Sequence, residues 1–125
     1  MKNLALIGRI LFALPFVIFG IMHLTSSEDM AGMALKDWPM AQGLVIISGL
    51  ALIAGGIGVL IGKMGKWASI GLAVLMLLFI VMLHMPNVMG GNEQMQQMGM
   101  ISTLKDLGLM GGALFFAWHF DQKEA

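Results

Sequence analysis

The sequence predicts an all-α membrane protein, built as a bundle of four transmembrane helices. Its 125 residues are 58% hydrophobic and only 11% charged, a composition far from that of soluble domains. Four apolar segments have about the length that a helix needs to cross roughly 30 Å of hydrocarbon. Because lipid does not tolerate open sheet edges, we expect these segments to be helices rather than strands.

Only two polar side chains, Arg9 and His23, interrupt the first apolar segment, Leu4–Leu24. They lie fourteen residues apart, close to four helical turns, and so share nearly the same side of the helix. A charge inside a membrane helix is costly and usually faces protein or a water-filled cavity. The segment therefore has an inner face. Its apolar run is longer than a signal-peptide core, so we expect it to be retained.

The other three expected helices are Pro39–Ile61, Trp67–Met85 and Met100–His119. The second and fourth helices carry small residues at helical spacing, which lets helix backbones approach closely in a membrane. Pro86 predicts that the third helix ends near His84 or Met85, because a residue that precedes proline disfavours the α conformation.

A short pattern, Glu-x-Met-x-x-Met, begins at Glu28 and again at Glu93. Each copy follows a helix that ends near a histidine, His23 or His84. The repeat is typical of a 2+2 internal duplication, whose halves would be related by an axis along the membrane normal. Chance similarity in a methionine-rich chain is the alternative.

The lysines indicate the orientation. Four of them fall on one side of the expected bundle: Lys2, Lys63, Lys66 and Lys123. Lys36 and Lys105 fall on the other side. The positive-inside rule then places both termini in the cytoplasm. A net charge of zero argues against nucleic-acid binding, and the absence of cysteine excludes paired-thiol redox chemistry.

Polar residues gather at the outer side of this arrangement. His23 and His84 end the first and third helices, and Lys105 and Asp106 lie about one turn inside the fourth helix at the same level. We expect an outward-facing ligand site there. Neighbouring side chains on a helix diverge by about 100°, so only one of Lys105 and Asp106 points inward. We favour Lys105, because it shares the glycine-bearing face of the fourth helix. The alternatives are ordinary interfacial histidines and a lysine that reaches toward the interface.

Arg9 lies about one turn inside the cytoplasmic end and keeps its charge. It could bind a carboxylate, helix-end carbonyls, a lipid phosphate or the head of a quinone, or act as a structural anchor. Asp121 and Glu124, after the fourth helix, are the only acidic candidates to pair with it.

Methionine is abundant, with fourteen residues that concentrate around the two outer loops. Thioethers and imidazoles are suitable ligands for Cu(I), so Met95, Met98 and Met100 with His23 and His84 form a candidate copper site. The two histidines alone could hold a haem as axial ligands. The alternative is that methionine serves as a flexible hydrophobe at the membrane surface.

Two segments resemble the DoxX family. The first helix contains Arg9 to Leu24, RILFALPFVIFGIMHL, and the fourth contains Thr103 to Leu114, TLKDLGLMGGAL. The resemblance implies a four-helix bacterial inner-membrane protein, related to subunits of thiosulfate:quinone oxidoreductases or of redox-defence complexes. The family's characteristic polar residues fall on Arg9 and Lys105. His23 departs from the family pattern, where many members have lysine.

These observations favour a membrane subunit of a redox assembly that binds a quinone-like lipid, with Arg9 or Lys105 polarising a carbonyl. The chain has no obvious redox centre, so a partner subunit or a cofactor is implied. The alternative is a non-catalytic scaffold, or a module that binds lipid or metal. Either function predicts contacts with membrane lipids and with other subunits or a second copy of the chain.

Overall fold

The structure, a computed structural model, describes residues 2–35 and 37–124 and contains only helices and connections within these ranges. The helices are α1 (Lys2–Thr25), α2 (Ser27–Ala34), α3 (Ala41–Ile61), α4 (Gly65–Phe79), η1 (Ile80–His84), α5 (Met85–Gly90) and α6 (Glu93–Glu124). Four helical stretches are long and apolar enough to cross a membrane: Lys2–Thr25, Ala41–Ile61, Gly65–Gly90 and Glu93–Lys123. The predicted all-α fold with four spans is confirmed.

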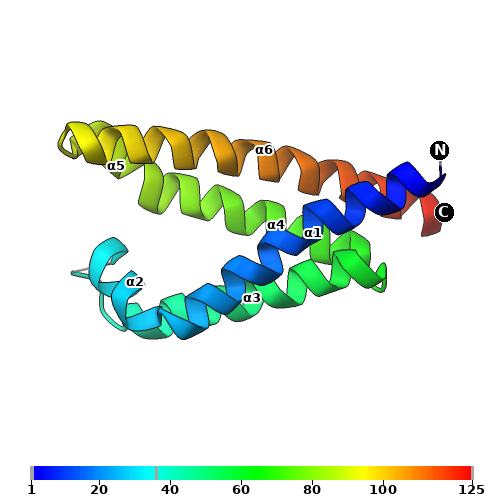
Figure 1. Ribbon diagram of the computed structural model, residues 1–125, viewed down its shortest axis with the longest axis horizontal. Coiled ribbons are helices and arrows are strands. Elements are labelled where there is room, and N and C mark those ends of the chain that lie inside the picture. The colour runs from blue at the N-terminus through cyan, green and yellow to red at the C-terminus, as the bar shows by residue number, and fades with distance from the viewer. Residues whose placement is uncertain (1, 36, 125) are drawn as a thin grey trace.

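The four long helices form two antiparallel pairs, α1 with α3 and α4 with α6, and a short turn joins α3 to α4 (Figure 1). Both termini and this turn lie at one end of the bundle, here called the terminus end. The short helices α2 and α5 lie at the opposite end, the loop end. The duplication remains a prediction, although each half of the chain supplies one antiparallel pair.

Glycines bring the helices into close contact, as their spacing predicts. A Cβ atom added at Gly20 of α1 would lie 2.6 Å from the carbonyl oxygen of Gly49 in α3, so the two backbones nearly touch. At Gly55 and Gly58 an added Cβ would meet α4 side chains at 2.6 and 2.7 Å. The expectation fails at Gly108, around which no atom lies within 4 Å of such a Cβ.

The buried core is small and runs between the helices. Its larger cluster comprises Ala13, Phe16, Leu52, Val59, Leu72, Ala73, Met76, Ala113 and Phe120, and a smaller one comprises Ala31, Leu35 and Val45. The outward faces of the spanning helices consist largely of exposed leucine, isoleucine, valine and methionine. Water would make such a surface unfavourable, whereas the hydrocarbon of a bilayer covers it without cost.

The third helix does not end at Met85, so this prediction is wrong. The helical path continues through η1 and α5 to Gly90. In η1 the backbone widens, and the N–H of Met85 donates to the carbonyl of Ile80, five residues back. Proline lacks an N–H and clashes with the carbonyl four residues before it, and a π-helical turn is one way to absorb that disruption. Pro86 therefore changes the winding of the helix but does not end it.

Candidate functional site

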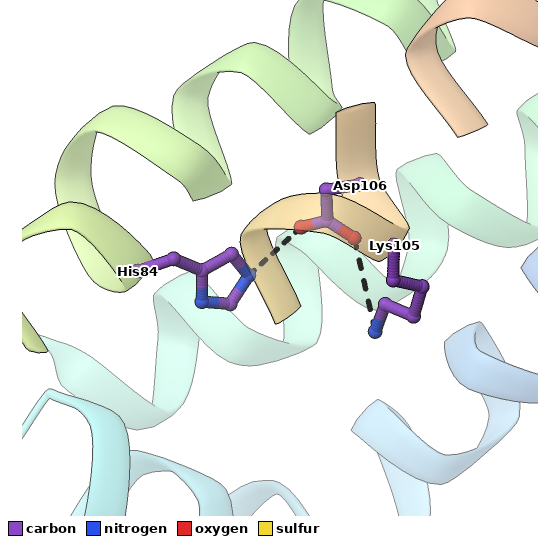
Figure 2. A network of polar contacts seen from close by, with 3 residues as sticks. All are labelled: His84, Lys105 and Asp106. Atoms are coloured by element: carbon purple, nitrogen blue, oxygen red, sulfur yellow. Dashed lines mark hydrogen bonds and ion pairs between the residues drawn. The ribbon is translucent and has the colours of Figure 1, made fainter. Parts of the chain in front are cut away.

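Among the described acidic side chains, that of Asp106 in the loop-end half of α6 is the most deeply buried, and it points toward His84 (Figure 2). Its Oδ2 accepts a hydrogen bond of 2.8 Å from Nε2 of His84 in η1. The Asp106 side chain is 3% exposed and that of His84 is 19% exposed. A buried carboxylate needs such a partner, because an isolated one would lose its hydration without compensation. The pair therefore joins α6 to the widened turn of the third span.

Lys105 lies beside this pair and is half exposed, whereas Asp106 is buried. Its Nζ is 3.7 Å from Oδ1 of Asp106, and its side chain is 49% exposed. The same ammonium group lies over the ring of Phe19 in α1, 4.9 Å from the ring centre. The expectation that Lys105 is the inward residue is wrong, because Asp106 takes that position. The glycine-bearing face of α6 is open at Gly108, so it does not mark the packed side there.

His23 approaches the same region from α1. Its Nδ1–H donates to the carbonyl oxygen of Phe19 at 2.6 Å, and its ring stacks on Phe79 of α4 with the ring centres 6.3 Å apart. The structure thus brings His23, His84, Lys105 and Asp106 to one level of the bundle. Phe19 and Phe79 connect them. We refer to these six residues as the loop-end cluster.

The two aromatic members of this cluster were missed in the sequence. Phe19 carried a usable signal, because it precedes His23 by four residues and so lies directly below it on α1. Phe79 carried none, since its contact depends on how α4 is rotated against α1.

The candidate metal ligands are only partly brought together. Met95, Met98 and Met100 all lie exposed on α6, where Met98 and Met100 are about 200° apart around the helix axis. Among the side chains that the structure describes, no three of His, Asp or Glu are grouped so as to hold a metal ion.

Arg9 lies at the other end of the bundle. Ten residues of α1 separate it from Phe19, about 15 Å along the axis, so one ligand headgroup cannot touch both Arg9 and Lys105. Its guanidinium carbon is 6.0 Å from the ring centre of Phe120. The expected partner Asp121 instead pairs with Lys66, at 2.8 Å between Oδ1 and Nζ. The side chain of Glu124, the other expected partner, lies outside the described residues.

Two hollows lie near the terminus end. A small pocket of about 100 Å³ is lined by Lys2, Ala5, Leu6, Arg9, His119 and Lys123. A larger groove of about 610 Å³ runs between α3 and α4, open to the outside and almost entirely apolar. Sequence reasoning missed His119 as a neighbour of Arg9, because nothing in the spacing of α1 and α6 shows how their ends meet.

The comparisons with known proteins place the chain in a family. The sequence model of the DoxX family matches residues 4–85, about two-thirds of the 125 residues. The match includes Arg9, His23 and His84 and ends before Lys105 and Asp106. Searches of curated proteins and of solved structures returned no match. With its four apolar spans, this chain is a membrane protein that belongs to the DoxX family.

Proposed function

We propose that this protein is a membrane subunit of a redox assembly and binds the headgroup of a quinone-like lipid at the loop-end cluster. The observation that carries the proposal is the buried His84–Asp106 hydrogen bond, which has an exposed ammonium group, Lys105, beside it. A histidine held by a carboxylate beside an exposed ammonium group has the donors that general acid catalysis uses. A quinone needs such a site, because its reduction consumes protons.

Reduction of a quinone to a quinol takes up two electrons and two protons. In the proposed site the ammonium group of Lys105 donates a hydrogen bond to one quinone carbonyl and stabilises the negative charge that develops there. The imidazolium form of His84 passes one proton to an oxygen of the reduced ring, and water at the outer surface supplies the second proton. Asp106 orients the imidazole and stabilises its charged form. The rings of Phe19 and Phe79 lie at the same level, against Lys105 and His23 respectively, and give the proposed site an aromatic border.

A further polar group supports a ligand at this place. The hydroxyl of Thr103 lies one turn before Asp106 on α6 and has no hydrogen-bond partner among the described residues, although it is buried. Buried hydroxyls are nearly always bonded, so each exception requires an explanation. A ligand that reaches the cluster would supply the missing partner.

The electrons must come from another subunit. The chain has no cysteine to ligate an iron–sulfur cluster, so we propose that a partner carries a flavin, an iron–sulfur cluster or a haem. Lys2, Lys63 and Lys66 all lie toward the terminus end, as does Lys123. Membership of the DoxX family supports a location in the bacterial cytoplasmic membrane. The positive-inside rule supports an orientation with both termini in the cytoplasm and the loop-end cluster near the outer surface.

The second candidate is a non-catalytic membrane scaffold. It is favoured by the contacts of Lys105, whose ammonium group lies against Phe19 of α1 and Asp106 of α6. In that case the cluster would only hold helices together, and loss of Lys105 would lower stability without changing ligand binding.

Binding of a short-chain ubiquinone or menaquinone analogue to the purified full-length protein distinguishes the two candidates. We expect Lys105→Leu and His84→Gln each to weaken quinone binding at least tenfold, with the helical content unchanged. Lys63→Leu is the matched control, because it removes an exposed lysine from the opposite end. Equal quinone affinity in all four proteins, or no measurable binding by the unaltered protein, would overturn the quinone site and favour the scaffold.

A further inference from the structure

A second polar site lies at the terminus end, where α1 and α6 meet. Three basic side chains, Lys2, Arg9 and Lys123, line the pocket of about 100 Å³ together with His119. The remaining lining is apolar and comes from Ala5 and Leu6 of α1. No carboxylate belongs to this lining, so the pocket gathers positive charge without a counter-charge among the described residues.

Arg9 is incompletely satisfied in this pocket. Its Nε is buried and has no hydrogen-bond partner among the described residues. Its Nη1 faces Gly62, where an added Cβ would be only 3.1 Å away, so the side chain passes close under the turn between α3 and α4. A buried donor without a partner costs about 1–3 kcal/mol, and more when it is charged. This arrangement therefore calls for an acceptor that the described chain does not supply.

Among the acidic side chains at this end of α6 that the structure describes, that of Asp121 is already engaged. Asp121 lies two residues before Lys123, but its carboxylate pairs with Lys66 at 2.8 Å. No carboxylate among the described side chains neutralises the pocket, so its positive charge is available for a ligand. A phosphate group matches it, because arginine donates parallel hydrogen bonds to phosphate oxygens and lysines add point charges.

We propose that this pocket binds the phosphate group of an anionic phospholipid. A volume of about 100 Å³ is well below the roughly 300 Å³ of the smallest pockets for drug-sized ligands, so the pocket accommodates a headgroup and not a whole cofactor. Leu6, which is 46% exposed, continues from the pocket onto the outer face of α1. The acyl chains would follow this apolar face while the phosphate stays at the helix ends. This site is separate from the loop-end cluster and does not depend on quinone binding.

Native mass spectrometry tests the proposal on the full-length protein, delipidated in a non-ionic detergent and then given phosphatidylglycerol or phosphatidylcholine. We expect one retained phosphatidylglycerol per chain, and at least tenfold weaker retention in Arg9→Met. The unaltered protein should retain less phosphatidylcholine, because the positively charged choline group is repelled by the basic side chains of the pocket. Lys63→Met is the matched control, since it removes one positive charge from the same end outside the pocket.

A second variant and a second ligand keep the test decisive. Lys2→Gln combined with Lys123→Gln changes two exposed side chains, so it should reduce lipid retention even if Arg9→Met fails to fold. Equal loss of lipid in Lys63→Met and Arg9→Met would overturn the pocket, because diffuse charge would then explain the binding. The second ligand is inorganic phosphate, which is added in place of lipid and measured in the same way. Retention or thermal stabilisation by inorganic phosphate, without retention of phosphatidylglycerol, would overturn the assignment to a lipid.

Discussion

The two ends of the bundle differ in whether their charged side chains have partners of opposite charge. At the loop end, Asp106 is buried, and its two oxygens contact His84 at 2.8 Å and Lys105 at 3.7 Å. At the terminus end, the cations around Arg9 surround a hollow, and the Nε of Arg9 has no partner among the described residues. The same two helices, α1 and α6, contribute to both ends. What differs is whether the chain supplies the counter-charge.

This difference indicates what each end requires. A buried charge persists only when it is paired or hydrogen-bonded, and at the loop end the chain itself supplies the partners of the buried Asp106 carboxylate. At the terminus end, the buried Nε of Arg9 has no such partner among the described residues. A ligand at the loop end would therefore add to contacts that already exist, whereas a ligand at the terminus end would satisfy a donor that otherwise remains unbonded.

The two histidines extend the comparison to the two halves of the chain. His84 donates to a side chain of another helix, whereas His23 donates to the backbone of its own helix. Asp37 follows the first Glu-x-Met-x-x-Met pattern as Asp106 follows the second, but it is exposed. If the halves arose by duplication, only the second half has kept or gained the buried pair.

The largest expected effect comes from breaking that pair. Asp106→Ala leaves His84 without its acceptor in a largely buried place, and we expect a loss of roughly 3–5 kcal/mol in the free energy of unfolding. Asp37→Ala is the control, because an exposed carboxylate should contribute within about 0.5 kcal/mol. Thermal unfolding in detergent, followed by circular dichroism, measures both. Similar melting temperatures would show that the pair does not hold the loop end together.

The next effect distinguishes the two ends of α1. Gly20→Ala forces a methyl group to within 2.6 Å of the Gly49 carbonyl oxygen in α3, and backbone cannot move aside as a flexible side chain can. We expect a loss of about 1–3 kcal/mol, typical of overpacking. Gly8→Ala lies on the same helix toward the terminus end, where nothing is within 4 Å of the added Cβ.

The control change should be neutral or stabilising by about 0.5–1 kcal/mol, because alanine has the higher helix propensity. The same unfolding measurement compares the two variants. If Gly8→Ala proved as damaging as Gly20→Ala, α1 would be packed equally tightly along its length, and the contrast between the two ends would not hold for the backbone.

The sequence was sufficient for the number and character of the spans, because apolar length alone identifies a membrane helix. It was less informative about the helix ends. Hydropathy marks where the apolar run stops, whereas the helix of α6 begins at Glu93 among polar residues that water can solvate. Pro86 was misjudged for a different reason, since η1 absorbs the missing hydrogen bond within a continuous helix.

The polar residues of the candidate site could be selected from the sequence, whereas their geometry could not. Each histidine, together with Lys105 and Asp106, stood out as a polar residue in an apolar setting. Which of the last two turns inward depends on the rotation of α6, and a helix that is apolar nearly all round carries little rotational signal. Contacts such as that of Lys105 with Phe19, or of Arg9 with Phe120, arise between helices far apart in sequence. No local pattern shows them.

The smallest expected effect comes from the ion pair at the terminus end. Lys66 and Asp121 are 28% and 50% exposed at their side chains, so solvent screens their attraction, and Asp121→Ala should cost at most about 1 kcal/mol. Lys66 also lies over the ring of Trp67 at 5.0 Å, so the change does not leave the ammonium group without contacts. In 1 M salt, where screening acts over about 3 Å, the difference from the unaltered protein should vanish. The cost of Asp106→Ala should persist in the same salt, because its partner is shielded from solvent. A loss for Asp121→Ala that did not respond to salt would mean that both ends rely on buried charge.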